Sequence, residues 1–247
     1  MSIDPIIITG GTENYAKNIN VLLSSLEHNN PKLNCIVYCF NWDELLINKF
    51  RNIYDVNFIK VVCKDELDLD VKNNTRSPEA LKIKIQCIFD TYLYAEDHSG
   101  ILWIDADSVI TRDLTPMLNI LSSGKYDVLC TRRKHRKAPH LIFALGVFGL
   151  SRTQNATRFI IKLCDNVKNS EGVGNWFHDQ LEFYNAFISI NPNIYPLTKY
   201  EHSLKGFLDS MIYSRRETID QSPKDVAKYH KIPIKQISNL PDSIYPA

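Results

Sequence analysis

Short apolar runs alternate with segments of helical periodicity along this chain, and this alternation restricts the possible fold more than any other feature. Four runs are predicted to be buried strands, at residues 6–9, 34–40, 57–62 and 101–105. Between them, apolar residues recur at helical spacing over residues 15–26 and 78–94, so we expect helices there. Ser77 and Pro78 are a typical helix start, with a capping residue and then proline at the first helical position.

Strands that are apolar on both faces and separated by helices are typical of a parallel sheet covered by helices on both sides. The pattern continues with a strand over residues 142–150 and helices over residues 155–167 and 176–187. The polar residues 64–74 are predicted to form a surface loop, and regular structure thins out after residue 191. The chain has no repeat and no obvious linker, so we predict one α/β domain over residues 1–247.

Composition excludes some classes of function. The 29 basic and 28 acidic residues leave a net charge of +1, so no overall field attracts nucleic acid or a membrane. The six cysteines form no CxxC pair, which favours buried free thiols in a reducing compartment. The first residues lack a basic stretch ahead of a short apolar run, unlike a signal peptide, and no apolar stretch reaches the roughly 20 residues that span a bilayer. We therefore expect a cytoplasmic protein without an integral membrane segment.

Two aspartates, Asp105 and Asp107, follow the predicted strand at residues 101–105. In an extended chain, residues i and i+2 point to the same side, and two close carboxylates repel each other unless a positive charge lies between them. Mn²⁺ or Mg²⁺ would supply that charge, because these ions bind carboxylate oxygens and leave other positions for substrate phosphates. The structural alternative is that these aspartates cap the next turn or pair with Arg112.

Several segments in this order resemble a known family. The segment WIDADSVITRDL resembles the D-x-D region of nucleotide-sugar-dependent glycosyltransferases with the A-type fold, such as glycogenin and galactosyltransferase relatives. The segments ITGGTENYAKNINVLLSSL, SPEALKIKIQCIF, FALGVFGLSRTQNATRFI and WFHDQLEFYNAF resemble other parts of that family in matching order. The resemblance covers about residues 6–200. It implies a single Rossmann-like domain, with a nucleotide-binding half at about residues 1–114 and an acceptor half with a C-terminal segment at about 115–247.

The resemblance also implies roles for individual residues. Asp107 would be the direct metal ligand, and Asp105 would face the metal or the ribose. Asp179 would be the catalytic carboxylate or would bind the sugar hydroxyls, with Gln180 next to it. Gly146 would leave room for the sugar, since a side chain there would intrude. The candidate donor-binding residues are Thr9, Gly10, Tyr15, Lys82, Lys84, Asp105, Ala106, Gly146 and Lys205. Lys205 is included for its charge, which could cover the diphosphate.

The sequence departs from the family at the last metal ligand. Many relatives have a late histidine, and here the comparable position is Ser210. Asp209, His202 or His230 could replace that histidine. We favour His202 as the third ligand, because a histidine followed by Lys-Gly is similar to another branch of relatives.

Basic residues offer further candidates. Lys82 and Lys84 lie two apart on a predicted helix and cannot both face the donor, so we expect one to reach the diphosphate and the other to be solvated. The cluster at residues 132–137 has three interpretations, namely a solvated loop, a site for an anionic acceptor, or a nucleic-acid site. The last is disfavoured because no aromatic residues interleave the cluster.

These observations lead to one main hypothesis and one rival. The main hypothesis is metal-dependent transfer of a sugar from a nucleoside diphosphate donor, such as a UDP-sugar, to an acceptor hydroxyl. The rival is a glycosyltransferase-like protein that has lost catalysis and binds a nucleotide sugar or a glycan. A haloacid dehalogenase-type phosphatase is disfavoured, because the later acidic element of that class is absent from the sequence. A nicotinamide-binding loop is disfavoured because residues 9–15 lack the third glycine.

Overall fold

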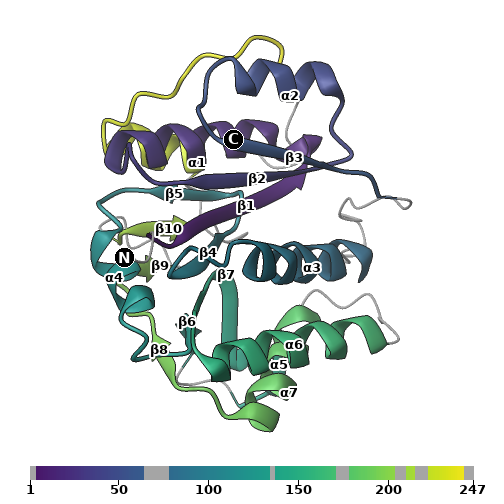
Figure 1. Cartoon of the computed structure of the whole chain (residues 1–247). Coiled ribbons are helices and arrows are strands. Elements are labelled where there is room, and N and C mark those ends of the chain that lie inside the picture. Colours follow the sequence, from purple (N-terminus) through teal and green to yellow (C-terminus); the bar gives the residue numbers. More distant parts are fainter. Residues whose placement is uncertain are drawn as a thin grey trace. The chain divides into compact units, whose positions relative to one another are not determined.

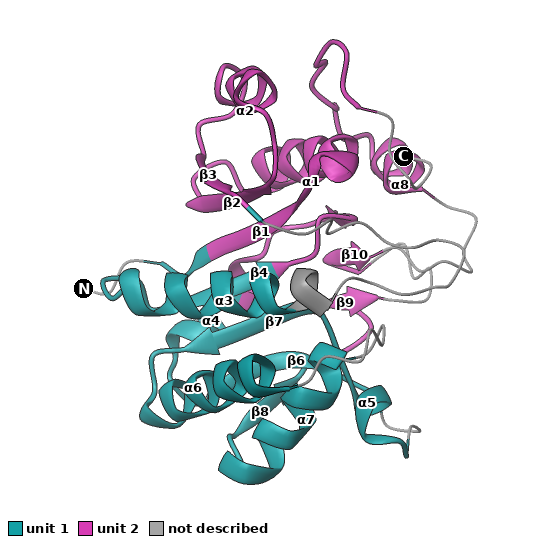
Figure 2. Cartoon of the chain, turned by 90° about the vertical axis from the view of Figure 1, so that its right-hand side faces the viewer, with its two compact units in different colours: residues 1–6, 63–103, 118–196 teal, residues 7–62, 104–117, 197–247 magenta. Residues whose placement is uncertain are grey.

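The computed structural model describes residues 4–63, 78–133, 137–170, 178–203, 210–214 and 222–241. The chain forms two compact units, each built from discontinuous segments (Figure 2). Unit 1 contains residues 1–6, 63–103 and 118–196, and unit 2 contains residues 7–62, 104–117 and 197–247. Figure 1 labels the helices and strands.

Unit 2 begins with a parallel strand ladder. Its strands are β1 (Ile6–Thr12, whose first residue belongs to unit 1), β2 (Cys35–Phe40) and β3 (Asn57–Val61), in the order β3-β2-β1. A short 3-10 turn (Glu13–Tyr15) leads from β1 into α1 (Ala16–Asn29), and α2 (Glu44–Arg51) connects β2 to β3. The α2 helix starts after Asp43, because the Asp43 carboxylate accepts a hydrogen bond from the amide of Leu46 at 2.6 Å.

The first strand is longer than the sequence predicts. The sequence predicts a strand over residues 6–9 only, but residues 10–12 continue β1 and pair with β2 as far as Thr12 opposite Phe40. Gly10 permits this pairing, because a Cβ atom at Gly10 would lie 2.8 Å from the carbonyl oxygen of Tyr38. The glycine therefore serves the close approach of two strands, which the turn-like sequence does not reveal.

A small three-stranded sheet also belongs to unit 2. It contains β5 (Ser108–Ile110), β10 (Ile212–Ser214) and β9 (His202–Ser203), with β10 antiparallel to β5 and parallel to β9. The last helix, α8 (Pro223–Tyr229), begins with a capping box between Ser222 and Asp225. An apolar cluster joins this sheet to α1 and α8; it contains Val21, Val109, Tyr213, Val226, Ala227 and Ile232.

Unit 1 contains the strand order β4-β7-β6-β8. The bounds are Gly100–Ile104 for β4 (whose last residue belongs to unit 2), Val128–Arg132 for β6, Phe143–Ser151 for β7 and Ile194–Pro196 for β8. Its helices are α3 (Pro78–Tyr94), α5 (Pro139–Ile142), α6 (Gln154–Asn169) and α7 (His178–Ile190), while α4 (Thr115–Ser122) starts in unit 2 and ends in unit 1. The rings of Phe148, Phe159 and Phe183 pack edge to face in the core between β7 and the helices α6 and α7.

The fold class is confirmed, because the structure is α/β with a mixed, mostly parallel central sheet. The strands predicted in the first 105 residues and at 142–150 are present, as are the helices predicted at 15–26, 78–94, 155–167 and 176–187, with ends shifted by a few residues. Strand β6 runs antiparallel to β7 and was not predicted. The predicted loop at 64–74 lies outside the described residues. The single-domain organisation stays a prediction.

All six cysteines are free thiols; five are buried, and Cys63 is half-buried. Among the described residues, no helix combines the length and the apolar character that a membrane span requires.

Candidate active site

The two aspartates lie directly beyond the end of a fully buried strand. All five residues of β4 are buried, and the strand ends at Ile104, so Asp105 is the first residue after its carboxyl end. The amide of Ser108 donates a hydrogen bond to the carbonyl oxygen of Asp105 at 3.1 Å, which closes a turn into β5. Exposure alternates through this turn, because Ala106 is buried while Asp105 and Asp107 are both half-buried. Both aspartate residues therefore keep part of their surface exposed.

Strand β5, which follows Asp107, is linked to His202 by hydrogen bonds. The hydroxyl groups of Ser108 and Ser214 are 2.6 Å apart, and Nε2 of His202 lies 3.0 Å from the Ser214 hydroxyl. All three side chains are buried, with at most 3% of their surface exposed. A buried hydrogen-bonded chain thus leads from the histidine to the residue next to Asp107, and it restricts where the histidine ring can turn.

The chemistry of these side chains suits a divalent cation, but the geometry of a complete site is not evident. Two half-buried carboxylates are the hard oxygen ligands that Mn²⁺ and Mg²⁺ take. Within the described ranges, no three His, Cys, Asp or Glu side chains lie together in a way that could hold a metal ion. A metal on Nε2 of His202 would have to replace its hydrogen bond to Ser214. A site made of Asp105, Asp107 and His202 therefore stays a prediction.

The other candidates for the third ligand are placed differently. His230 follows the end of α8, where its ring packs against Tyr229 at a centroid distance of 5.0 Å. Asp209 and the donor-binding candidate Lys205 lie outside the described residues. Ser210, which the sequence resemblance places at the position of a family histidine, is buried, and its hydroxyl donates to the carbonyl oxygen of Ile212 at 3.0 Å.

The candidates near the start of the chain fall into an accessible and an inaccessible group. Tyr15 is half-buried at the end of the 3-10 turn, and Gly10 is half-buried in β1. Thr9 is fully buried, and its hydroxyl has no hydrogen-bond partner among the described residues. The structure therefore gives Thr9 no surface for direct contact with a donor.

A second group of candidates lies within unit 1, where Lys84 is buried. Its Nζ atom donates a hydrogen bond to the carbonyl oxygen of Leu145 at 3.0 Å and lies 3.8 Å from a carboxylate oxygen of Asp179. The same Nζ is 5.4 Å from the centre of the Trp103 ring. Lys84 and Asp179 are 7% and 5% exposed. Lys84 on α3 therefore connects β7, immediately before Gly146, to the first turn of α7.

Helix α7, predicted at residues 176–187, places Asp179 and Gln180 near its start. Asp179 is in the first turn of the helix, where a carboxylate is stabilised by the helix dipole. Gln180 is half-buried, and its Oε1 accepts a hydrogen bond from the Arg133 guanidinium at 3.3 Å. Arg133 belongs to the basic cluster at 132–137, so one member of this cluster is bound to a candidate site residue. Lys82 is half-buried, and so is Gly146.

Three contributors were not singled out from the sequence. Ser108 and Ser214 connect the D-x-D segment to His202, and Arg133 holds Gln180. Serine is too common for its position to be informative, and the two serines are separated by 106 residues. Arg133 had a detectable signal in the charge cluster, but the sequence gives no indication that it bonds to Gln180.

A comparison with models of protein families identifies one match, Glycosyl transferase family 8, over residues 6–200. The chain belongs to this family. It is therefore a glycosyltransferase, an enzyme of EC class 2.4. The predicted resemblance to glycosyltransferases with the A-type fold is confirmed. A search of curated protein sequences finds no match.

Solved structures of glycosyltransferases share the fold of this family 8 chain. The galactosyltransferase LgtC in complex with donor and acceptor sugar analogues superposes with a TM-score of 0.62 at 13% identity, covering 96% of this chain and 97% of LgtC. The apo form of the glycosyltransferase GlyE of Streptococcus pneumoniae gives a TM-score of 0.63 at 14% identity, covering 92% of this chain and 60% of GlyE. At 13% and 14% identity, these two matches show a shared fold only.

Proposed function

We propose that this family 8 glycosyltransferase transfers a sugar from a nucleoside diphosphate donor, a UDP-sugar, to an acceptor hydroxyl with the help of a divalent metal. The observation that carries the proposal is the D-x-D segment, where two half-buried carboxylates follow the carboxyl end of a buried strand. Ligands of α/β sheets bind at the carboxyl ends of strands. A uracil base is supported by half-buried Tyr15 and the family resemblance.

Asp107 and Asp105 would hold the metal, either Mn²⁺ or Mg²⁺, with His202 as the favoured third ligand. When bound, such an ion neutralises negative charge that develops on a diphosphate leaving group. The part of His202 follows from its environment, since the Ser214 and Ser108 hydroxyls fix its ring relative to β5. Ligation through Nε2 would replace the bond to Ser214, so the metal and no longer this hydroxyl would then hold the ring.

Asp179 would contact the sugar, as the catalytic carboxylate or as an acceptor of sugar hydroxyl groups. Its position is fixed from two sides, by the Lys84 ammonium and by the first turn of α7. Lys84 would act through Asp179, because its Nζ is already bound to the Leu145 carbonyl and adjacent to the carboxylate. Lys82 would then be the member of this lysine pair that reaches the donor.

The nature of the acceptor is suggested by charge. Arg132 and Lys137 are exposed, and Arg133 between them bonds to Gln180. An acceptor that carries negative charge would be attracted to these side chains. The six free cysteines support a cytoplasmic location for the reaction.

The test is a thermal-shift panel of nucleoside diphosphates and nucleotide sugars, measured with and without Mn²⁺. A ligand at a hundredfold excess over its Kd stabilises the folded state by about 2.7 kcal/mol, which the assay resolves. We expect uridine nucleotides to raise Tm only with the metal present, and Asp107→Asn to abolish that shift. The exposed Asp55 provides the matched control, since Asp55→Asn removes an equal charge from the same unit.

Turnover of a labelled donor separates the enzyme from a binding protein. An active transferase, given its acceptor or water, releases nucleoside diphosphate from the labelled sugar. A metal-dependent shift without any release would favour the rival interpretation of a degenerate binding protein. A panel in which no nucleotide shifts Tm, with or without Mn²⁺, would contradict the proposed donor class.

A further inference from the structure

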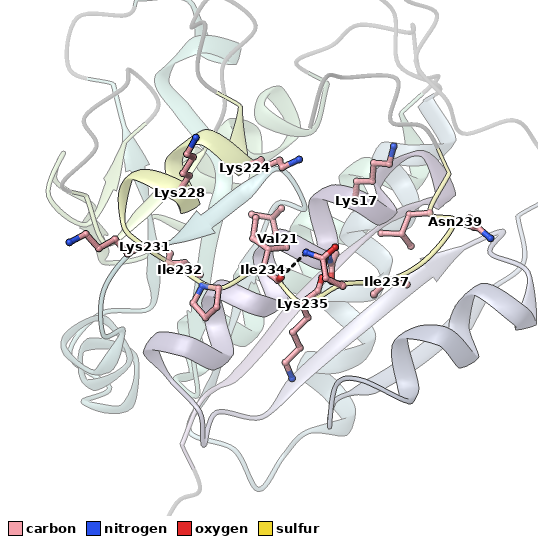
Figure 3. A pocket seen from close by; sticks show the side chains of 14 residues that line it. Lys17, Val21, Lys224, Lys228, Lys231, Ile232, Ile234, Lys235, Ile237 and Asn239 are labelled. Atoms are coloured by element: carbon pink, nitrogen blue, oxygen red, sulfur yellow. Dashed lines mark hydrogen bonds between the residues drawn. The ribbon is translucent and has the colours of Figure 1, made fainter.

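Unit 2 contains a groove whose lining residues have no role in the proposed transferase reaction. It has a volume of about 740 Å³ and lies between α1, α8 and the segment that follows α8 (Figure 3). We call it the lysine groove. Its lining residues are Lys17, Asn20, Val21, Lys224, Lys228, Lys231, Ile232, Pro233, Ile234, Lys235, Gln236, Ile237, Asn239 and Leu240.

The charge of the groove is one-sided. Five of the fourteen lining residues are lysines and none is acidic, although the chain as a whole has a net charge of only +1. One of the five, Lys235, is already paired, because its Nζ lies 2.5 Å from the Glu27 carboxylate and donates to the Ile53 carbonyl at 3.0 Å. Lys224, Lys228 and Lys231 are exposed. A concentration of like charges around a concave surface favours an anionic ligand.

The base of the lysine groove is apolar and held in place. Val21 and Ile232 belong to the buried cluster beneath α8, and Ile234 packs against that cluster. Two hydrogen bonds fix the segment after α8 to α1. The side-chain amide of Asn20 donates to the backbone carbonyl of Lys235 at 2.9 Å, and the backbone amide of Lys235 donates to the Ser24 hydroxyl at 3.1 Å. The groove therefore exists before any partner binds, which lowers the entropic cost of binding.

We propose that the lysine groove binds an acidic peptide segment of a partner protein, with apolar side chains entering the base and carboxylates meeting the lysines. A single phosphate would need ammonium groups that converge on one point, whereas Figure 3 shows those of Lys231 and Lys17 on opposite sides of the groove. A flat membrane surface would not reach the half-buried Ile234, which packs against the buried cluster at the base. An extended chain of acidic and apolar residues satisfies both the charge and the shape.

The experiment measures binding of fluorescein-labelled peptides by fluorescence polarisation to the full chain. One probe alternates glutamate with leucine, and the second alternates glutamate with glycine. We expect the glutamate–leucine peptide to bind more tightly, because only it can fill the apolar base. Lys224→Glu combined with Lys228→Glu should weaken this binding about tenfold, since each exposed charge pair contributes a small factor and reversal counts twice.

The matched control is Lys32→Glu combined with Lys60→Glu, which makes the same change of charge at exposed lysines of unit 2 outside the groove. This control should bind the peptide like the wild type. If the Lys224 and Lys228 charge reversal impairs folding, the milder pair Lys224→Gln and Lys228→Gln replaces it, with an effect in the same direction.

Three results would overturn the proposal: no binding of the glutamate–leucine peptide, equal loss in the groove and control variants, or equal affinity for both peptides. Vesicles containing phosphatidylserine are included as a competitor. Lysine-dependent binding of these vesicles in the absence of peptide binding would identify the groove as a membrane contact and would also overturn the proposal.

Discussion

Removal of the Lys84 ammonium is the most informative perturbation of the candidate site. Lys84 and Asp179 are 7% and 5% exposed, and Nζ lies 3.8 Å from the carboxylate oxygen. With an effective dielectric constant of about 20, the attraction between two charges at this distance is about 4 kcal/mol. Lys84→Met keeps most of the aliphatic volume but leaves the carboxylate buried without this cation.

The expected loss of unfolding free energy is about 3–5 kcal/mol for Lys84→Met, and similar for Asp179→Asn, because each leaves one buried charge without the opposite charge at 3.8 Å. The double variant removes both charges and should lose about 2–3 kcal/mol less than the sum of the single losses. Lys84→Met also loses the hydrogen bond to the Leu145 carbonyl, a loss that the cycle subtracts because it is present in the double variant too.

Urea denaturation of the four proteins, with the midpoint and the slope fitted separately, provides the measurement. A coupling energy below about 0.5 kcal/mol would mean that the two residues act independently, and the reasoning about a buried pair would be refuted. In a transferase assay, Lys84→Met should also lower kcat, by up to about a hundredfold, because a carboxylate displaced by an ångström is poorly placed for catalysis.

Three further predictions concern stability. Gly10→Ala should lower the unfolding free energy by about 1–3 kcal/mol, measured by urea denaturation, because the new Cβ would lie 2.8 Å from the Tyr38 carbonyl oxygen; a neutral result would show that β2 can shift. The Asn18 side chain is fully buried and lacks a hydrogen-bond partner among the described residues. Asn18→Leu should therefore raise Tm, with a gain in unfolding free energy of about 1–3 kcal/mol. A lower Tm would show that an ordered water satisfies the Asn18 amide. Ser222→Ala should cost about 0.5–2 kcal/mol by removing the cap of α8. The hydrogen bonds from Ser222 lower the pKa of the Asp225 carboxyl. Their contribution to stability is therefore present at neutral pH and is lost as the pH falls through that lowered pKa. The difference in Tm between wild type and Ser222→Ala should accordingly shrink in acid.

The sequence predicts those elements whose burial follows a regular period. Strand β4 is buried at every residue and reads as an uninterrupted apolar run, and α3 spans Pro78–Tyr94 as its periodicity indicates. The short strands of the small sheet were not predicted, because two or three residues are too few for a period to be detected. Their stability comes from partners far along the chain, such as Ser214 opposite Ser108.

For the candidate site, the sequence identifies residue types better than it identifies contacts. The D-x-D aspartates were proposed because two carboxylates after a strand end suit a metal ion. Asp179 was proposed from the family resemblance. Lys84 was predicted to reach a diphosphate or to be solvated. In the structure it is buried beside Asp179, and its side chain crosses from α3 to the carbonyl oxygen of Leu145. A contact between residues so far apart in the sequence depends on packing, which no local pattern encodes.

The surroundings of His202 show why the third metal ligand cannot be identified by spacing. A histidine ligand needs a second-shell partner that orients its ring. In the structure, Nε2 of His202 is hydrogen-bonded to Ser214, which is in turn bound to Ser108, the residue after Asp107. Ser214 would be such a second-shell partner only for a metal on Nδ1. This hydrogen-bonded chain fixes the histidine relative to the D-x-D segment, but it occupies Nε2. Ser214→Ala would release that nitrogen while keeping the strand. If His202 is a ligand through Nε2, this variant should increase its affinity for Mn²⁺, measured by titration with the nucleotide present. If His202 only supports β5, the variant should lose stability without any gain in affinity for the metal.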